Sequence, residues 1–250
     1  MRGVITNERI LLEEALNGRM EERTINKLIL MTKMYFARGK SIDEVIKLLN
    51  KHMDKYYKGY VVTKWASKIK QIVTSSKKTD NFKIRDIKEV VIYKDEWDRI
   101  MELEVDGLRR VAFVLLVYGK LNEAREYRTP ERIYNNITDI LTEANVRVLT
   151  ENKKMIKDLV DLGYVKLSNS CNASSIDITF LSKEKEEEFI KINDFRNVLS
   201  YYYEITKKKE YIKCEICGVR VEKRTCNSRV KYCKECYKKQ DNNNRNNRKR

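Results

Sequence analysis

Two Cys-x-x-Cys pairs near the end of the sequence constrain its fold more than any other feature. Cys214 and Cys217 form the first pair, and Cys233 and Cys236 follow after 15 intervening residues. This spacing is typical of a structural zinc site, because two such pairs close a tetrahedron of thiolates around one ion and leave no open position. Gly218 follows the first pair, where the turn needs a positive φ. We therefore predict a small Zn²⁺-binding module rather than a catalyst, with disulfides or free thiols as the alternatives.

The residues between and after the pairs suggest how this module folds. Val219 and Val221 alternate with polar residues, as in one arm of a hairpin, and Val230 and Tyr232 would supply the returning arm. The second pair runs into a segment that favours a helix. Over residues 211–240 this order resembles the treble-clef zinc finger more than the zinc ribbon.

Two further cysteines have no Cys-x-x-Cys partner. Cys226 lies between the pairs and could replace a ligand, but we interpret it as a spare thiol. Cys171 is expected to be an ordinary free cysteine.

The length and composition indicate a folded protein of one or two domains with an appendage. The chain has 250 residues, of which 42% are hydrophobic. No secretory signal opens the sequence, and the longest apolar run, residues 111–118, is too short to cross a membrane. We therefore expect a cytoplasmic protein without a membrane partner, in a reducing compartment that favours metal over disulfides.

The net charge of +16 calls for an explanation. Abundant Lys, Asn, Ile, Glu and Tyr suggest an AT-rich genome, and that bias raises the lysine content. It also raises the glutamate content, so the excess of basic residues points to a polyanionic partner such as nucleic acid. The alternative is a basic surface that serves only solubility.

Residues 1–80 are expected to form a small helical domain, and residues 81–104 a connector that favours a strand at residues 89–93 and a helix from about Asp95. Helical periodicity covers residues 8–16, 22–38 and 61–73, and Ser41 with Glu44 forms a capping-box pattern that opens a further helix. Residues 74–81 are polar enough to be a hinge. The order of these helices resembles the C-terminal helical domain of some primases and phage replication proteins. Since only a few residues precede the first helix, we expect no polymerising activity.

Residues 105–182 carry a second pattern. Residues 108–118 favour a buried helix, which Gly119 and Lys120 would end, and shorter helices are expected at residues 137–144 and 150–162. Two alternating strands follow at residues 164–168 and 175–180. This order resembles the winged helix-turn-helix family.

The winged-helix resemblance implies that helix 150–162 enters the major groove of DNA and that the hairpin contacts the backbone. The residues placed at DNA by this resemblance are Asn152, Lys153, Lys154 and Lys157 on the helix, and Lys166, Asn169 and Asn172 on the wing. The alternative is a solvated face on a domain that docks proteins. Three acidic residues, Glu151, Asp158 and Asp161, make the helix less basic than a strong DNA reader.

The remaining segments are a linker and a basic terminus. Residues 183–210 are expected to be a linker with a helix that Asp194 caps and that begins at Phe195; its Leu199, Tyr202 and Tyr203 pack on a neighbouring module. Residues 241–250 lack apolar side chains and are expected to be disordered. Basic residues of the finger and tail are candidates for phosphate contacts: Arg220, Lys223, Arg224, Arg229, Lys231, Arg245, Arg248, Lys249 and Arg250.

No catalytic constellation is recognisable, and we expect no enzyme. His52 is the single histidine, and residues 211–250 hold none, unlike treble-clef nucleases of the HNH type. The sequence lacks a phosphate-binding P-loop, a dinucleotide-binding glycine motif and a nucleophile elbow. A nuclease built from carboxylates alone stays open as an alternative.

Together the patterns predict a mainly α protein with a helical domain, a winged helix-turn-helix and a small four-cysteine zinc finger. This order resembles uncharacterised proteins of bacteriophages and mobile elements. The resemblance implies a protein that binds nucleic acid, DNA in the first place, in replication or transcription regulation. The alternative function is an adaptor that grips a replication, transcription or host-defence protein.

Overall fold

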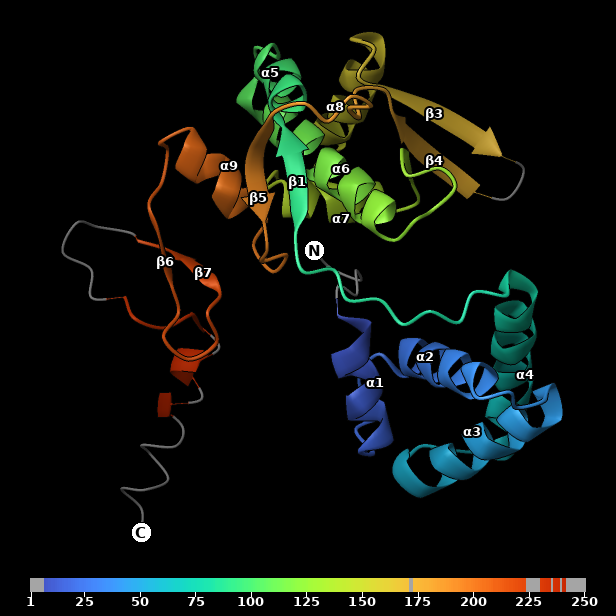
Figure 1. Ribbon diagram of the computed structural model, residues 1–250. Helices are drawn as coiled ribbons and strands as arrows, with labels where there is room; N and C mark the ends of the chain where they lie inside the picture. The colour runs from blue at the N-terminus through green and yellow to red at the C-terminus, as the bar shows by residue number, and fades with distance from the viewer. Residues whose placement is uncertain (1–6, 171–172, 224–229, 235, 239, 242–250) are drawn as a thin grey trace. The chain divides into compact units, whose positions relative to one another are not determined.

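The chain divides into two units, with the boundary between residues 88 and 89. The computed structural model (Figure 1) describes residues 7–170, 173–223, 230–234, 236–238 and 240–241. Helices make up most of the regular structure, and the strands form three small sheets. The mainly α prediction is confirmed at this level.

The first unit is built from α1 (Glu8–Leu16), α2 (Thr24–Ala37), α3 (Ile42–Tyr56) and α4 (Val62–Thr79). Their apolar faces meet in one core, in which Leu28, Met31, Leu49 and Ile69 are fully buried. The capping box that opens α3 is confirmed: the Ser41 hydroxyl accepts from the Glu44 N–H, and the Glu44 carboxylate accepts from the Ser41 N–H.

The predicted hinge at residues 74–81 is wrong, because α4 continues through Thr79. The side-chain hydroxyls of Thr74 and Thr79 donate to the helix carbonyls of Lys70 and Ser76, at 2.8 Å each. Such back-bonding lets polar Ser and Thr residues remain inside a helix. A polar stretch of sequence alone therefore does not predict a break in a helix.

His52 is a packed residue of the first unit. Its Nε2 lies 2.9 Å from the carbonyl oxygen of Ala15, and its ring lies 4.7 Å from that of Tyr56. Burial lowers the pKa of His52 below its ordinary value of 6.5, against the opposing effect of the hydrogen bond to Ala15. The fold thus prefers the neutral imidazole.

This preference predicts a titration and its effect on stability. Because the folded-state pKa is depressed, the stabilisation from His52 is complete above about pH 6.5 and is lost as the pH falls through the folded-state pKa. The sequence holds one histidine, so its ring protons in an NMR titration report this group alone. We expect a midpoint below 6.5, and His52→Gln should weaken the loss of thermal stability between about pH 7.5 and about pH 5.5. A midpoint at or above 6.5 would contradict the assignment.

The second unit begins inside the expected connector. Strand β1 (Val90–Tyr93) leads directly into α5 (Lys94–Met101), and Trp97 and Ile100 of α5 are buried. Strand β5 (Glu188–Ile192) pairs antiparallel with β1, with Val90 opposite Ile192. Residues 90–101 therefore belong to the core of this unit.

Helix α6 (Asp106–Ala124) is the central helix of the second unit and is buried along most of its length. The expectation that Gly119 and Lys120 end it is wrong, because the helix runs five residues further than Gly119. A Cβ at Gly119 would lie 3.0 Å from Ile178 and 3.3 Å from Leu181, so glycine admits these side chains against the helix. Among the described residues, no helix is both long and apolar enough to cross a membrane.

A strand, two helices and a hairpin follow α6 and pack on it. These elements are β2 (Arg132–Ile133), α7 (Ile137–Glu143), α8 (Thr150–Asp161), β3 (Val165–Ser170) and β4 (Ala173–Ile178). The three strands form an antiparallel sheet in the order β2-β4-β3. Strand β2 is absent from the sequence-based expectation; Arg132 anchors it through two 2.9 Å contacts with the carboxylate of Asp177 on β4.

Helix α9 (Leu199–Ile205) packs into the same unit, as expected for Leu199, Tyr202 and Tyr203, and Tyr202 is fully buried. The helix begins four residues later than predicted. Asp194, expected to cap it, instead accepts from the N–H and guanidinium of Arg196.

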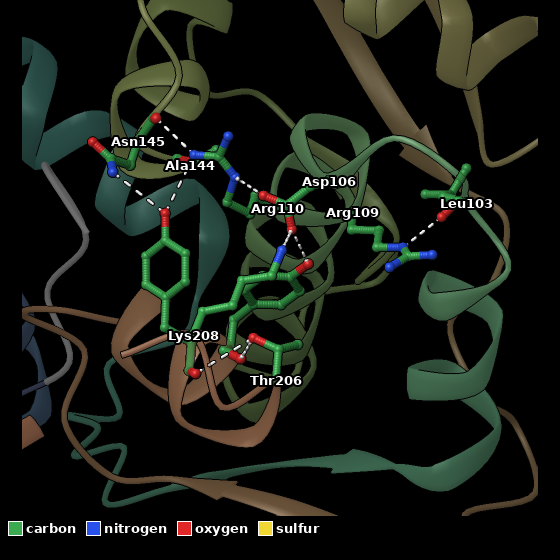
Figure 2. A network of polar contacts seen from close by, with 10 residues as sticks. Leu103, Asp106, Arg109, Arg110, Ala144, Asn145, Thr206 and Lys208 are labelled. Atoms are coloured by element: carbon green, nitrogen blue, oxygen red, sulfur yellow. Dashed lines mark hydrogen bonds and ion pairs between the residues drawn. The ribbon is translucent and has the colours of Figure 1, made fainter. Parts of the chain in front are cut away.

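A polar network connects α9 to the start of α6 (Figure 2). Asp106 accepts hydrogen bonds from the Tyr202 hydroxyl at 2.7 Å and from Lys208, and it pairs with Arg110 at 3.1 Å. Burial raises the pKa of Asp106, but Lys208 and Tyr202 outweigh it, so the pKa is lowered on balance. Arg110 also donates to the carbonyl oxygens that follow α7, at Ala144 and Asn145.

Glu96 of α5 is the most deeply buried charge of the second unit among the described residues. Its carboxylate forms an ion pair with Lys120 at 2.6 Å and accepts from the N–H groups of Ser182 and Tyr93 at 2.7 and 2.9 Å. The side chains of Glu96 and Lys120 are 0% and 2% exposed. One carboxylate therefore joins β1, α5, α6 and the segment after β4.

Removing this charge should be costly. Glu96→Gln removes the 2.6 Å partner of the buried Lys120 and leaves only Glu123, at 3.8 Å, as its acidic partner, and we expect a loss of roughly 3–5 kcal/mol of unfolding free energy. Asp98→Asn is the matched control, because its pair with Lys94 is accessible to solvent, and it should change stability by at most about 1 kcal/mol. Urea unfolding in a Trp65→Phe background leaves Trp97, beside Glu96, as the single tryptophan reporter. Equal midpoints for the two variants would refute the expectation.

Candidate metal centre and charged surfaces

The first cysteine pair forms the turn of a short hairpin. Strand β6 (Tyr211–Lys213) pairs antiparallel with β7 (Arg220–Glu222), and Cys214 to Gly218 lie in the connection between them. Gly218 has φ +69°, and its N–H donates to the Cys214 carbonyl at 2.8 Å. We call this turn, residues 214–218, the knuckle; it brings the two cysteines close together.

The predicted returning arm at Val230 and Tyr232 is wrong. Strand β7 pairs with the strand that precedes the knuckle, because Gly218 lets the chain reverse at once. The later segment makes a different contact, in which the Glu215 N–H donates to the Lys231 carbonyl at 3.0 Å. This contact brings the second cysteine pair beside the first.

Cys233 and Cys236 lie at the start of a helical segment. Residues 234, 236–238 and 240–241 are helical, and the Tyr237 N–H donates to the Cys233 carbonyl at 2.9 Å. The N–H of Cys236 points to the Cys233 sulfur at 3.4 Å. The helix start therefore presents both sulfurs to the knuckle.

The four sulfurs of Cys214, Cys217, Cys233 and Cys236 lie within 4.8 Å of one another. The Cys217 and Cys233 sulfurs are 3.7 Å apart, close to the edge of about 3.8 Å that a tetrahedron with metal–sulfur bonds of about 2.3 Å requires. A disulfide would need about 2.05 Å. The arrangement can hold a metal ion, and Cys214 and Cys236 are buried in it.

The surroundings of Cys214 favour a thiolate. Burial raises the pKa of this thiol, but N–H groups of Cys217, Cys233 and Ile216 outweigh burial and bring the pKa to about 6. At Cys236, burial and the neighbouring sulfurs raise the pKa to about 12. A bound cation would remove the repulsion among the sulfurs and allow all four to ionise.

Residues outside the finger support the knuckle, although no spacing in the sequence marks them. The guanidinium of Arg196 donates to the Cys217 carbonyl at 2.8 Å and is held by Asp194. The Asn197 side chain donates to the Arg220 carbonyl at 3.1 Å. The loop before α9 thus holds the knuckle and the strand that follows it.

Three finger cations named from the sequence are paired with acidic side chains. Arg220 pairs with Glu204 and lies 4.3 Å from the centre of the Tyr201 ring, so it belongs to the contact between finger and α9. Lys223 pairs with Glu210 at 3.1 Å, and Lys231 pairs with Glu215 at 3.6 Å. Exposed pairs such as Lys231–Glu215 contribute little to stability.

The cations placed on α8 and the wing are more accessible. Lys154 and Lys157 are exposed on α8, and Lys166 is exposed on β3. Asn152 and Lys153 lie in α8 and Asn169 in β3, but their side chains fall outside the described part. The other sequence-derived candidates are also outside it: Cys171, Asn172, Arg224, Cys226, Arg229, Arg245, Arg248, Lys249 and Arg250.

The net charge is distributed unevenly along the chain. Residues 1–88 carry +10 and residues 211–250 carry +9, whereas residues 89–210 between them carry −3. The basic excess therefore belongs to the first unit and to the finger with its tail.

Comparisons with protein-family models, curated proteins and solved structures found no match to this chain. The chemistry of the centre therefore rests on its own geometry.

The geometry predicts one thiolate-bound metal ion per chain. Cys233→Ser removes one ligand and should reduce the bound metal and the thermal stability of the finger, because ion binding supplies much of the folding free energy of such modules. Cys171→Ser is the control, since Cys171 has no Cys-x-x-Cys partner. Elemental analysis after gel filtration measures the metal. Metal-free wild-type protein that melts like Cys233→Ser would rule out the centre.

Proposed function

We propose that the chain is a nucleic-acid-binding protein, with DNA as its first target, of phage or mobile-element replication or gene regulation. The observation that carries the proposal is the concentration of basic charge at the two ends, against a slightly acidic middle. A general solubilising bias would be spread along the chain. Localised positive charge matches a polyanion. A cytoplasmic location follows as part of the same proposal.

The ion of the four-cysteine centre is Zn²⁺ in this proposal. A set of four thiolates selects zinc or an iron–sulfur cluster. The sulfur separation of 3.7 Å supports a single tetrahedral ion. Its role would be structural: it holds the knuckle against the helix start and so fixes the basic finger to α9.

The elements from α6 to β4 support a winged helix-turn-helix. Their order is helix, strand, two helices and hairpin, and the sheet order is β2-β4-β3. Helix α8 would then enter the major groove, with Lys154 and Lys157 toward the phosphates. Asp158 and Asp161 are exposed on the same helix, so α8 would bind more weakly than a fully basic helix.

A salt titration tests the part assigned to α8. Lys154→Gln/Lys157→Gln should lower the slope of log affinity against log salt by about 2 for duplex DNA, at about 0.9 per lost phosphate contact. Lys185→Gln/Lys191→Gln removes the same charge from cations that are paired with Glu123 and Glu188, and its slope should stay close to that of wild type. Fluorescence anisotropy with a labelled duplex gives both slopes. Equal slopes for the two variants would remove α8 from the interface.

The adaptor function is favoured by exposed apolar side chains around α8. Leu149, Leu162 and Leu167 are each more than half exposed, and such residues are more typical of protein contacts than of phosphate contacts. Under this alternative, association with a host replication, transcription or defence protein survives nuclease treatment and is lost in Leu167→Glu. We assign no catalytic role to any residue. Mg²⁺- or Mn²⁺-dependent cleavage of DNA by the pure protein would contradict this assignment.

A further inference from the structure

The hairpin of α3 and α4 is rich in lysine, and these lysines belong neither to the metal centre nor to α8. From the start of α3 at residue 42 to the end of α4 at residue 79 there are nine lysines and three acidic residues, Asp43, Glu44 and Asp54. Helix α4 alone has five lysines and no acidic residue. All nine lysines are exposed: Lys47, Lys51, Lys55, Lys58, Lys64, Lys68, Lys70, Lys77 and Lys78.

These lysines differ from others of the same unit in lacking acidic partners. Lys27, Lys33 and Lys40 lie within 3.3 Å of Glu14, Glu8 and Glu44, respectively. Within residues 7–88, all of which the structure describes, none of the nine forms a salt bridge with an acidic side chain. Their charge is therefore available to an external anion.

Part of the lysine set lies along one face of α4. Lys64, Lys68 and Lys78 follow a spacing of four and ten residues, which places them on one stripe opposite the buried Ile69 and Val73. Gln71 and Ser75 are exposed on the same stripe and add hydrogen-bond donors. From Lys64 to Lys78 the helix rises about 21 Å, a length over which duplex DNA carries about twelve phosphate charges.

The loop between the two helices is held by aromatic contacts. Tyr57 and Trp65 meet edge to face at 5.4 Å, and the Tyr60 hydroxyl donates to the Asn50 side chain. Lys55 lies 4.8 Å from the centre of the Tyr56 ring. The basic hairpin is thus a packed surface, which lowers the ordering cost of binding.

We propose that this hairpin is a second nucleic-acid-binding surface, in which the α4 stripe of Lys64, Lys68 and Lys78 contacts the phosphate backbone. The surface extends the proposed function but uses none of the residues assigned to α8 or to the finger. Protein interfaces are depleted of lysine, and a membrane-binding helix would need an apolar face outward. The α4 stripe contains only Lys, Gln and Ser, which favours a polyanion bound without sequence readout.

The test is a triple variant of the full-length protein, Lys64→Gln/Lys68→Gln/Lys78→Gln. We expect its affinity for a duplex of about 30 base pairs to fall at least about tenfold at about 0.1 M salt, and the salt slope to fall by about 3. The control is Arg9→Gln/Lys40→Gln/Lys94→Gln, which also removes three charges, from solvent-accessible cations paired with Asp86, Glu44 and Asp98. Its affinity should stay within about twofold of wild type.

The outcomes separate this surface from the rest of the proposal. Equal losses of affinity in the triple variant and its control would mean that net charge alone causes the effect, which would overturn the proposed surface. The surface also fails if the triple variant binds DNA like wild type, or if it loses binding only to phosphatidylserine vesicles. Cys233→Ser and the α8 double variant test the proposed function separately: if they bind DNA normally while the triple variant does not, the α4 surface stands and the assignment to α8 and the finger falls. No binding by wild type at low salt would overturn both.

Discussion

The buried ion pair of Glu96 and Lys120 is the constraint on which the second unit depends. Moving both charges out of water is unfavourable unless every lone pair finds a partner, and two N–H groups complete the coordination of Glu96. Alternative packings of β1, α5 or the segment after β4 would leave one charge buried alone. The pair therefore specifies one arrangement of these elements more than it adds stability. That arrangement in turn places α6 at the centre of the unit.

From α6 a chain of polar contacts reaches the metal centre. Asp106 accepts from the hydroxyl of Tyr202 of α9, Glu204 of the same helix pairs with Arg220, and Arg196 donates to the Cys217 carbonyl. The finger is thus bound to the unit by its own Arg220 and by Arg196 of the loop before α9, and Arg220 is therefore less available for phosphate than its charge suggests. A metal ion would stabilise more than the finger, because the knuckle and the loop before α9 share these hydrogen bonds.

Local patterns predicted the parts of the structure that local forces decide. Helical patterns predicted α1 to α8, and the cysteine spacing predicted the four clustered sulfurs. Strand β5 was not predicted, because only its Ile190 and Ile192 are buried in a charged segment and its partner β1 lies almost a hundred residues earlier. The supporting contacts of Arg196 and Asn197 were not predicted for the same reason: they form between segments that only the tertiary fold brings together. Gly119 looked like a helix end, but its small size serves packing against Ile178.

The distribution of charge limits what composition can explain. An AT-rich genome raises lysine and glutamate together, and residues 183–210 fit that pattern, with seven basic and seven acidic residues. Residues 42–79 do not, since nine lysines there accompany only three acidic residues. Mutual repulsion among the five lysines of α4 opposes folding, and acidic residues at i,i+4 within this helix would relieve it. Their absence is therefore unfavourable for the free protein, and the proposed nucleic-acid ligand would supply the missing negative charge.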